Sequence, residues 1–120
     1  MAHEMLQTMI FPTPGESNTR ATLDAAVERA GTLGIEQMVV ATSTGRTALE
    51  AAERFSGRII AVTLSAGHWE RYCPPDPEII AELRRREVVV LTGTHTLLGG
   101  IDGGLSAIGG VSASEIIART

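Results

Sequence analysis

Residues 38–54 read Met-Val-Val-Ala-Thr-Ser-Thr-Gly-Arg-Thr-Ala-Leu-Glu-Ala-Ala-Glu-Arg, and this stretch decides the fold. The apolar run Met38–Ala41 predicts a buried strand, and the alanine-rich run Ala48–Arg54 predicts a helix. The loop between them, residues 42–47, holds small hydroxyl residues, one glycine and one arginine. The chain is therefore expected to contain a strand that ends in a polar loop, from which a helix begins.

The loop at residues 42–47 has the chemistry of an anion site. The start of a helix offers unpaired backbone N–H groups and the positive end of the helix dipole, which together suit a phosphate. Hydroxyl groups donate further hydrogen bonds, and an arginine binds two oxygens at once. The same residues are also typical of a well-capped strand-to-helix turn, although such a turn does not require an arginine. The candidate phosphate ligands are Thr42, Ser43, Thr44, Gly45, Arg46 and Thr47.

Two further apolar runs, Ile59–Leu64 and Val88–Leu91, accompany Met38–Ala41. All three are continuous rather than alternating, which predicts strands buried on both faces of a parallel sheet. Helical patterns lie between the runs, and this order indicates a layered α/β fold with right-handed crossovers. The length of 120 residues supports a single domain over residues 1–120.

Local signals mark the first two helices. Asn18 or Thr19 is the expected cap of the first helix, and Gly34 is its expected end. The second helix, which begins near residue 48, is expected to end at Gly57. Before these helices, Met5–Phe11 is interpreted as a short additional strand. Residues 92–111 hold seven glycines, six of them in three adjacent pairs, and are interpreted as a loop.

Two later helices also carry start signals. Asp76 followed by Pro77 has the order of a cap residue and a first helical position. The run Arg84–Arg86 is interpreted as the end of that helix, where cations favour the dipole, rather than as a nucleic-acid patch. Ser112–Glu115 has the spacing of a capping box in front of Ile116-Ile117, which predicts a last helix.

The composition excludes several classes of protein. All ten basic residues are arginine and the net charge is −4, so no basic cluster is long enough to follow a nucleic-acid backbone. The single cysteine excludes an internal disulfide framework and fits a reducing compartment. No apolar run is long enough to span a membrane. The chain has His3 and Glu4 near its N-terminus, whereas a signal peptide begins with basic residues. We therefore expect a cytoplasmic protein with no nucleic-acid or membrane partner.

Small polar residues and glycines follow each expected strand. Because the carboxyl ends of parallel strands meet at one edge, these loops are expected to form one ligand site. His95 is interpreted either as a hydrogen-bond partner of a phosphate or a ring edge of the ligand or, equally, as a structural histidine whose hydrogen bonds are satisfied within the protein. Trp69 is interpreted either as a ring that stacks on a ligand or, more simply, as a surface aromatic. The further pocket residues predicted at this edge are Gly67, His68, Thr94 and His95.

No metal site or catalytic group is predicted. Cys73, His68 and His95 are scattered and lack the paired spacing of zinc ligands. Neither a Ser-His-acid arrangement nor a pair of carboxylates is apparent. The chain contains no lysine, and we expect no transfer of phosphate from phosphoenolpyruvate to ADP. Whether the protein is an enzyme stays open.

The segment Thr42–Ala48 resembles the phosphate loop of the pyruvate kinase C-terminal domain, which holds a sugar phosphate of the allosteric activator. The chain is more similar to small stand-alone proteins of that fold, the pyruvate kinase alpha/beta domain-like family. The resemblance runs from about Phe11 to the C-terminus. Its motifs are Pro14-Gly15 with Asn18-Thr19, the loop at 42–47, Gly93-Thr94-His95, and Gly109-Gly110-Val111-Ser112.

This resemblance implies a three-layer α/β/α fold with a small, mainly parallel sheet. It assigns the phosphate to residues 42–47, and it implies flavin mononucleotide as the first candidate cofactor because some relatives bind it. Two departures are expected to alter the rest of the pocket. Relatives have a charged stretch where this chain has residues 100–104, and they continue into further strands where this chain ends at Thr120.

We therefore expect the protein to bind a phosphorylated small molecule at the carboxyl ends of the strands. The alternative is a regulatory or interaction module with an empty pocket. Without the later strands of its relatives, the outer side of strand Met38–Ala41 is expected to lack a partner. This leads us to expect a homo-oligomer, most simply a two-fold dimer.

Overall fold

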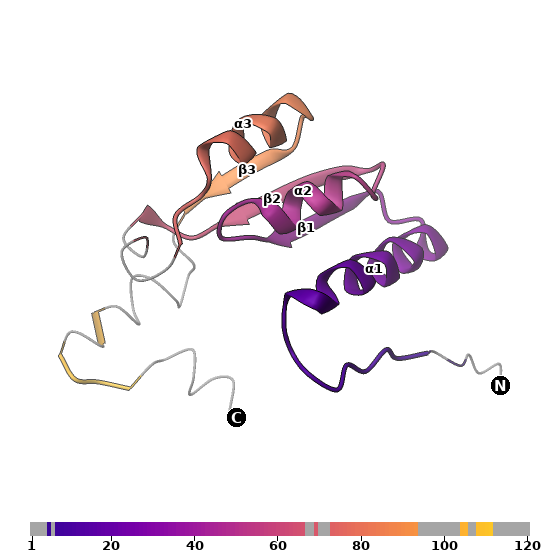
Figure 1. Ribbon diagram of the computed structural model, residues 1–120, viewed down its shortest axis with the longest axis horizontal. Coiled ribbons are helices and arrows are strands. Elements are labelled where there is room, and N and C mark those ends of the chain that lie inside the picture. Colours follow the sequence, from indigo (N-terminus) through magenta and orange to yellow (C-terminus); the bar gives the residue numbers. More distant parts are fainter. Residues whose placement is uncertain are drawn as a thin grey trace.

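The computed structural model describes residues 5, 7–66, 69, 73–93, 104, 105 and 108–111. This part of the chain forms a small α/β structure with a parallel three-stranded sheet (Figure 1). The α/β class is the one that the sequence predicts. Its elements are η1 (Glu16–Asn18), α1 (Thr19–Leu33), β1 (Gln37–Ala41), α2 (Arg46–Ala52), β2 (Arg58–Thr63), α3 (Pro77–Arg85) and β3 (Val89–Thr92).

The strands lie in the sheet in the order in which they occur in the chain, β1-β2-β3. In β1, Val39 lies opposite Ile60 of β2, and Ile60 in turn lies opposite Val89 of β3. All pairs are parallel, so the carboxyl ends of the three strands lie at the same edge. Within the described residues β1 and β3 are the two edge strands, as expected for β1 from the sequence.

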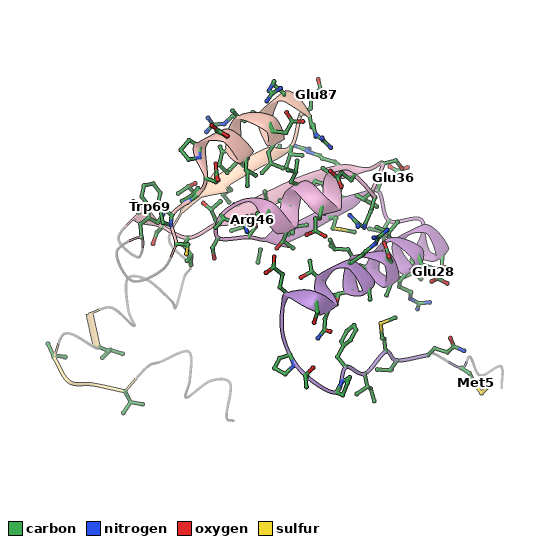
Figure 2. The ribbon with its side chains drawn as sticks, in the orientation of Figure 1. Met5, Glu28, Glu36, Arg46, Trp69 and Glu87 are labelled. Atoms are coloured by element: carbon green, nitrogen blue, oxygen red, sulfur yellow. The ribbon has the colours of Figure 1, made fainter. Side chains whose placement is uncertain are left out.

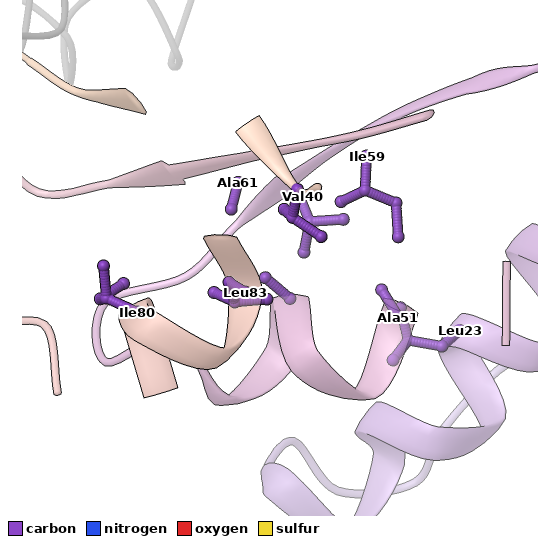
Figure 3. Close-up of a cluster of buried hydrophobic side chains, with 9 residues drawn as sticks. Leu23, Val40, Ala51, Ile59, Ala61, Ile80 and Leu83 are labelled. Atoms are coloured by element: carbon purple, nitrogen blue, oxygen red, sulfur yellow. The ribbon is translucent and has the colours of Figure 1, made fainter. Parts of the chain in front are cut away.

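The helices pack on one face of the sheet. Helix α2 contacts β1 and β2, α3 contacts β3 and α2, and α1 packs beside α2. Figure 3 shows the resulting core between the strands and the helices, with Leu23 of α1 close to Ala51 of α2. Its buried members are small or branched aliphatic residues: Leu23, Val40, Ala48, Ala51, Ile59, Ala61, Ile80, Leu83 and Val88.

The opposite face of the sheet is not covered by these helices, so the prediction of strands buried on both faces does not hold for the described residues. On that face Val39 is 66% exposed, Leu91 55% and Val89 41%. Burial alternates along β2, where Ile59, Ala61 and Thr63 are buried and the residues between them are only half-buried. The helices therefore supply one layer over the sheet, and the α/β/α arrangement stays a prediction.

The predicted ends of α1 and α3 are confirmed, and those of the second helix are not. Helix α1 begins at Thr19 with Asn18 as its N-cap residue. Asp76 Oδ1 accepts the N–H groups of Glu78 and Ile79 at 2.9 and 3.3 Å, and Pro77 is the first residue of α3. Gly34 ends α1 in the left-handed region, with φ of 65°. The second helix differs, because α2 begins at Arg46 and ends at Ala52. The arginines at 84 and 85 lie in the last turn of α3, as predicted.

The interpretation of Met5–Phe11 as a strand is wrong. Residue 5 and residues 7–11 form no strand, and Met5, Met9 and Ile10 are largely exposed. Irregular backbone in this segment pairs with neither edge of the sheet, so its apolar composition does not reflect a place in the core. The predicted capping box at Ser112–Glu115 lies outside the described residues.

Candidate functional site

The loop at residues 42–47 joins the carboxyl end of β1 to α2, as the sequence predicts. The Thr42 N–H donates to the Val62 carbonyl at 2.9 Å, which continues the β1–β2 pairing by one residue. Arg46 and Trp69 lie toward the same end of the sheet in Figure 2. The loop thus lies at the edge where ligands bind in open parallel sheets.

Gly45 allows the loop to turn into α2. It precedes the helix with φ of 103°, a left-handed conformation that residues with a Cβ rarely adopt. A Cβ at this position would lie 2.8 Å from Ile79 Cγ2 and 3.4 Å from Leu83 Cδ1 of α3. Glycine is therefore required twice here, by the backbone conformation and by the close approach of α3.

Two of the predicted ligands form hydrogen bonds within the loop. Thr42 Oγ1 accepts the Gly45 N–H at 3.1 Å, and Thr44 Oγ1 accepts the Arg46 N–H at 3.4 Å. Thr42 is buried and Ser43 is exposed. These bonds fit the capping alternative, because they satisfy N–H groups that an anion would otherwise bind. Since each threonine uses its oxygen as acceptor, its hydroxyl proton is still available as a donor.

Arg46 is the feature that capping does not explain. It is the first residue of α2, its side chain is exposed, and the first turn holds no acidic residue. Within the described part of the chain no ion pair involves its guanidinium. A cation at the positive end of a helix is unfavourable by about 0.3–1 kcal/mol. A bound anion would offset this repulsion.

Asp76 also contacts the loop, which the sequence analysis missed. Its backbone N–H donates to the Thr44 carbonyl at 2.9 Å, so the start of α3 is tied to the loop before α2. The sequence predicted Asp76 as a helix cap, but it did not predict this contact with Thr44. The pairing was foreseeable only from the expectation that the segments around the carboxyl edge meet.

Other polar groups at the carboxyl edge come from β2, β3 and the residues after them. The hydroxyl groups of Thr63 and Thr92 lie 2.7 Å apart. Trp69 donates its indole N–H to the Leu64 carbonyl at 3.0 Å and is 38% exposed, as in the surface-aromatic interpretation. The four predicted pocket residues Gly67, His68, Thr94 and His95 lie outside the described residues.

Three hollows of the described structure lie away from this loop. Two of them, of about 490 and 450 Å³, are both lined by Ser56, Gly57 and Arg58 at the amino end of β2. A third, of about 660 Å³, separates the N-terminal segment from α1. The loop at residues 42–47 lines none of these three hollows.

Metal ligands do not gather in the described residues. No group of three or more His, Cys, Asp or Glu side chains lies together there, and Cys73 is exposed. The same residues include no helix that is both long and apolar enough to cross a membrane. No protein-family model matches the chain.

Proposed function

We propose that this protein binds a phosphorylated small molecule at the loop formed by Thr42, Ser43, Thr44, Gly45, Arg46 and Thr47. Arg46 carries the proposal, because it is an exposed cation at the start of α2 with no acidic partner among the described residues. An anion there gains a charge-assisted hydrogen bond from the guanidinium and a favourable interaction with the helix dipole. The hydroxyl groups of the neighbouring residues add uncharged donors.

Flavin mononucleotide is the first candidate ligand. Its phosphate suits the loop, and its flat ring suits an exposed aromatic at the same edge of the sheet. Trp69 is that aromatic, since its indole ring is 38% exposed while its N–H is held by the Leu64 carbonyl. The resemblance to the pyruvate kinase alpha/beta domain-like proteins, with their three-layer fold, belongs to the same proposal.

Titration of flavin mononucleotide and of inorganic phosphate into the wild type and Arg46→Ala tests the site. We expect the variant to bind more weakly by about 1.5–3 kcal/mol, roughly 10- to 150-fold, for a lost hydrogen bond to a charged group. Arg20→Ala is the matched control, because Arg20 is an exposed arginine in the first turn of α1. Equal affinity of wild type and Arg46→Ala would remove Arg46 from the site.

The alternative is a regulatory or interaction module with an empty pocket. The exposed apolar residues on the free face of the sheet, and the hydrogen bonds that close the loop on itself, favour this alternative. The same titration distinguishes the two functions. Binding of neither flavin mononucleotide nor phosphate by the wild type would favour the interaction module. A homo-oligomer is compatible with both functions and stays a prediction.

A further inference from the structure

The face of the sheet opposite the helices presents six apolar side chains in two rows. The register places Val39, Ile60 and Val89 in one row across the three strands, and Ala41, Val62 and Leu91 in the next. We call these six residues the open face. In each strand they alternate with residues that point toward the helices, so they project from the opposite side.

The open face has the character of a buried surface. None of its six residues can form a side-chain hydrogen bond or carries a charge, yet the two valines and the leucine of the edge strands are 41–66% exposed. Parallel sheets are normally covered on both faces, because their strands are apolar on both sides. An apolar segment is therefore the kind of partner that fits here, and a charged one is not.

The size of the open face discriminates between partners. With strands about 4.8 Å apart and a same-face repeat of about 6.8 Å, six side chains cover roughly 200 Å². A stable dimer buries about 800 Å² on each partner, so a second copy that met only this face would bury too little. A helix of nine residues is about 13 Å long and about 10 Å wide, which matches the open face.

We propose that the open face binds the segment Ser112–Thr120 of the same chain. Its sequence begins with the capping box Ser112–Glu115 and places apolar or small residues at 113, 116, 117 and 120, the spacing of one helical face. The segment lies outside the described residues, and its sequence matches the size and apolar character of the open face.

The connection between β3 and this segment is long enough. β3 ends at Thr92, and residues 93–111 follow before Ser112. At about 3.3 Å per extended residue, this length spans the sheet several times over. A tethered segment also has a high effective concentration, so a small contact suffices where two separate chains would need a large one.

Disulfide trapping in the full-length chain tests the proposal. In a Cys73→Ser background, Leu91→Cys on the open face is combined with Ile116→Cys, on the apolar side of the segment. The matched control combines Leu91→Cys with Ala118→Cys, which lies on the opposite side of the same expected helix. We expect mild oxidation to give a disulfide of monomer mass at least five times faster for the first pair than for the control.

Two outcomes would overturn the proposal. Equal rates for the two pairs would mean that the apolar side of the segment does not bind the open face. A disulfide of dimer mass as the main product would assign the open face to a second copy. If Leu91→Cys fails to fold, as judged by circular dichroism, Val39→Cys replaces it, because Val39 lies on the other edge of the open face and is more exposed.

Discussion

The two faces of the sheet are built from similar residues but have opposite surroundings. On the face toward the helices, Ala61 of β2 and Leu83 of α3 are fully buried, and the neighbouring residues of α2 are alanines. On the open face, Leu91 and Val39 are more than half exposed. Apolar character alone is therefore no guide to burial, because it is the crossover helices that decide which side of each strand is covered.

The difference follows from the path of the chain. It steps across the sheet in one direction, from β1 to β2 to β3, and crossovers of one hand then place α2 and α3 on the same side. Helix α1 precedes β1 and packs beside α2 rather than on the free side. A layer on the open face must therefore come from another part of the chain or from a partner.

The largest expected effect compares one leucine from each side. Leu83→Ala removes a fully buried side chain and should lower the free energy of unfolding by about 2–5 kcal/mol. Leu91→Ala removes a side chain that is 55% exposed in the described structure. It should cost less, about 1–2 kcal/mol, because the segment Ser112–Thr120 would cover it through a single small contact. Urea denaturation of both variants measures the difference.

Equal losses for the two variants would mean that both leucines are buried to the same extent in solution, so that the two faces of the sheet do not differ in burial. A further measurement repeats Leu91→Ala in an Ile116→Asp background. If the segment Ser112–Thr120 binds the open face, the two substitutions remove the same contact and their effects should not add.

A pair of glycines gives the next largest effect. Gly45→Ala introduces a left-handed alanine and a Cβ only 2.8 Å from Ile79 on the helix-covered side. We expect a loss of about 2–4 kcal/mol from backbone strain and overpacking together. Gly34→Ala is the control, because Gly34 is also left-handed but a Cβ there meets no atom within 4 Å. Its loss should be about 1–2 kcal/mol, from strain alone.

Thermal or urea denaturation of the two glycine variants measures the packing contribution as a difference. A loss for Gly45→Ala no larger than that for Gly34→Ala would show that α3 does not press on the loop. The packing of α3 against Gly45 would then not hold the loop of the candidate site in place.

The smallest effect is expected on the solvent side of α3. Hydrogen bonding from Arg86, at 2.6 Å, lowers the pKa of Glu82 below its ordinary value of 4.5, and the charges of Arg85 and Arg86 lower it further. Because the folded-state pKa is lowered, the stabilisation is complete above pH 4.5 and disappears as the pH falls through the lowered pKa.

Glu82→Gln should therefore be slightly less stable than the wild type at pH 7 and equal to it in strong acid. Urea denaturation at several pH values gives this difference directly. A stability difference that stays constant down to the most acidic pH would show that the arginines do not act through the charge of Glu82.

Local signals in the sequence predicted the elements because they act over a few residues. Asp76 and Pro77 specify a helix start by themselves, and Gly34 specifies a helix end, so both were correct. The start of α2 was placed two residues late, because its cap is Gly45 rather than a hydroxyl residue. The hydroxyl groups of Thr42 and Thr44 accept hydrogen bonds inside the loop instead.

Contacts between residues far apart in the sequence could not be predicted from local signals. The apolar segment Met5–Phe11 resembles a strand, yet residues 7–11 pair with neither edge of the sheet. The bond between the Asp76 N–H and the Thr44 carbonyl joins residues from different crossovers, which only the three-dimensional arrangement brings together. The loop of the candidate site was located correctly, because its place between a strand and a helix is a local property.

The strand order in the sheet is also the order in which the strands are synthesised. Each strand pairs with the strand made before it, so the first strand–helix–strand unit is complete once Thr63 has left the ribosome. Among the described elements, α3 and β3 are then still to be added to the edge formed by β2. Parallel pairs need a crossover between them, so each pairing can form only after the helix that precedes the next strand has been made. The strand order thus allows the described strands of a nascent chain to pair one at a time, in the order of their synthesis.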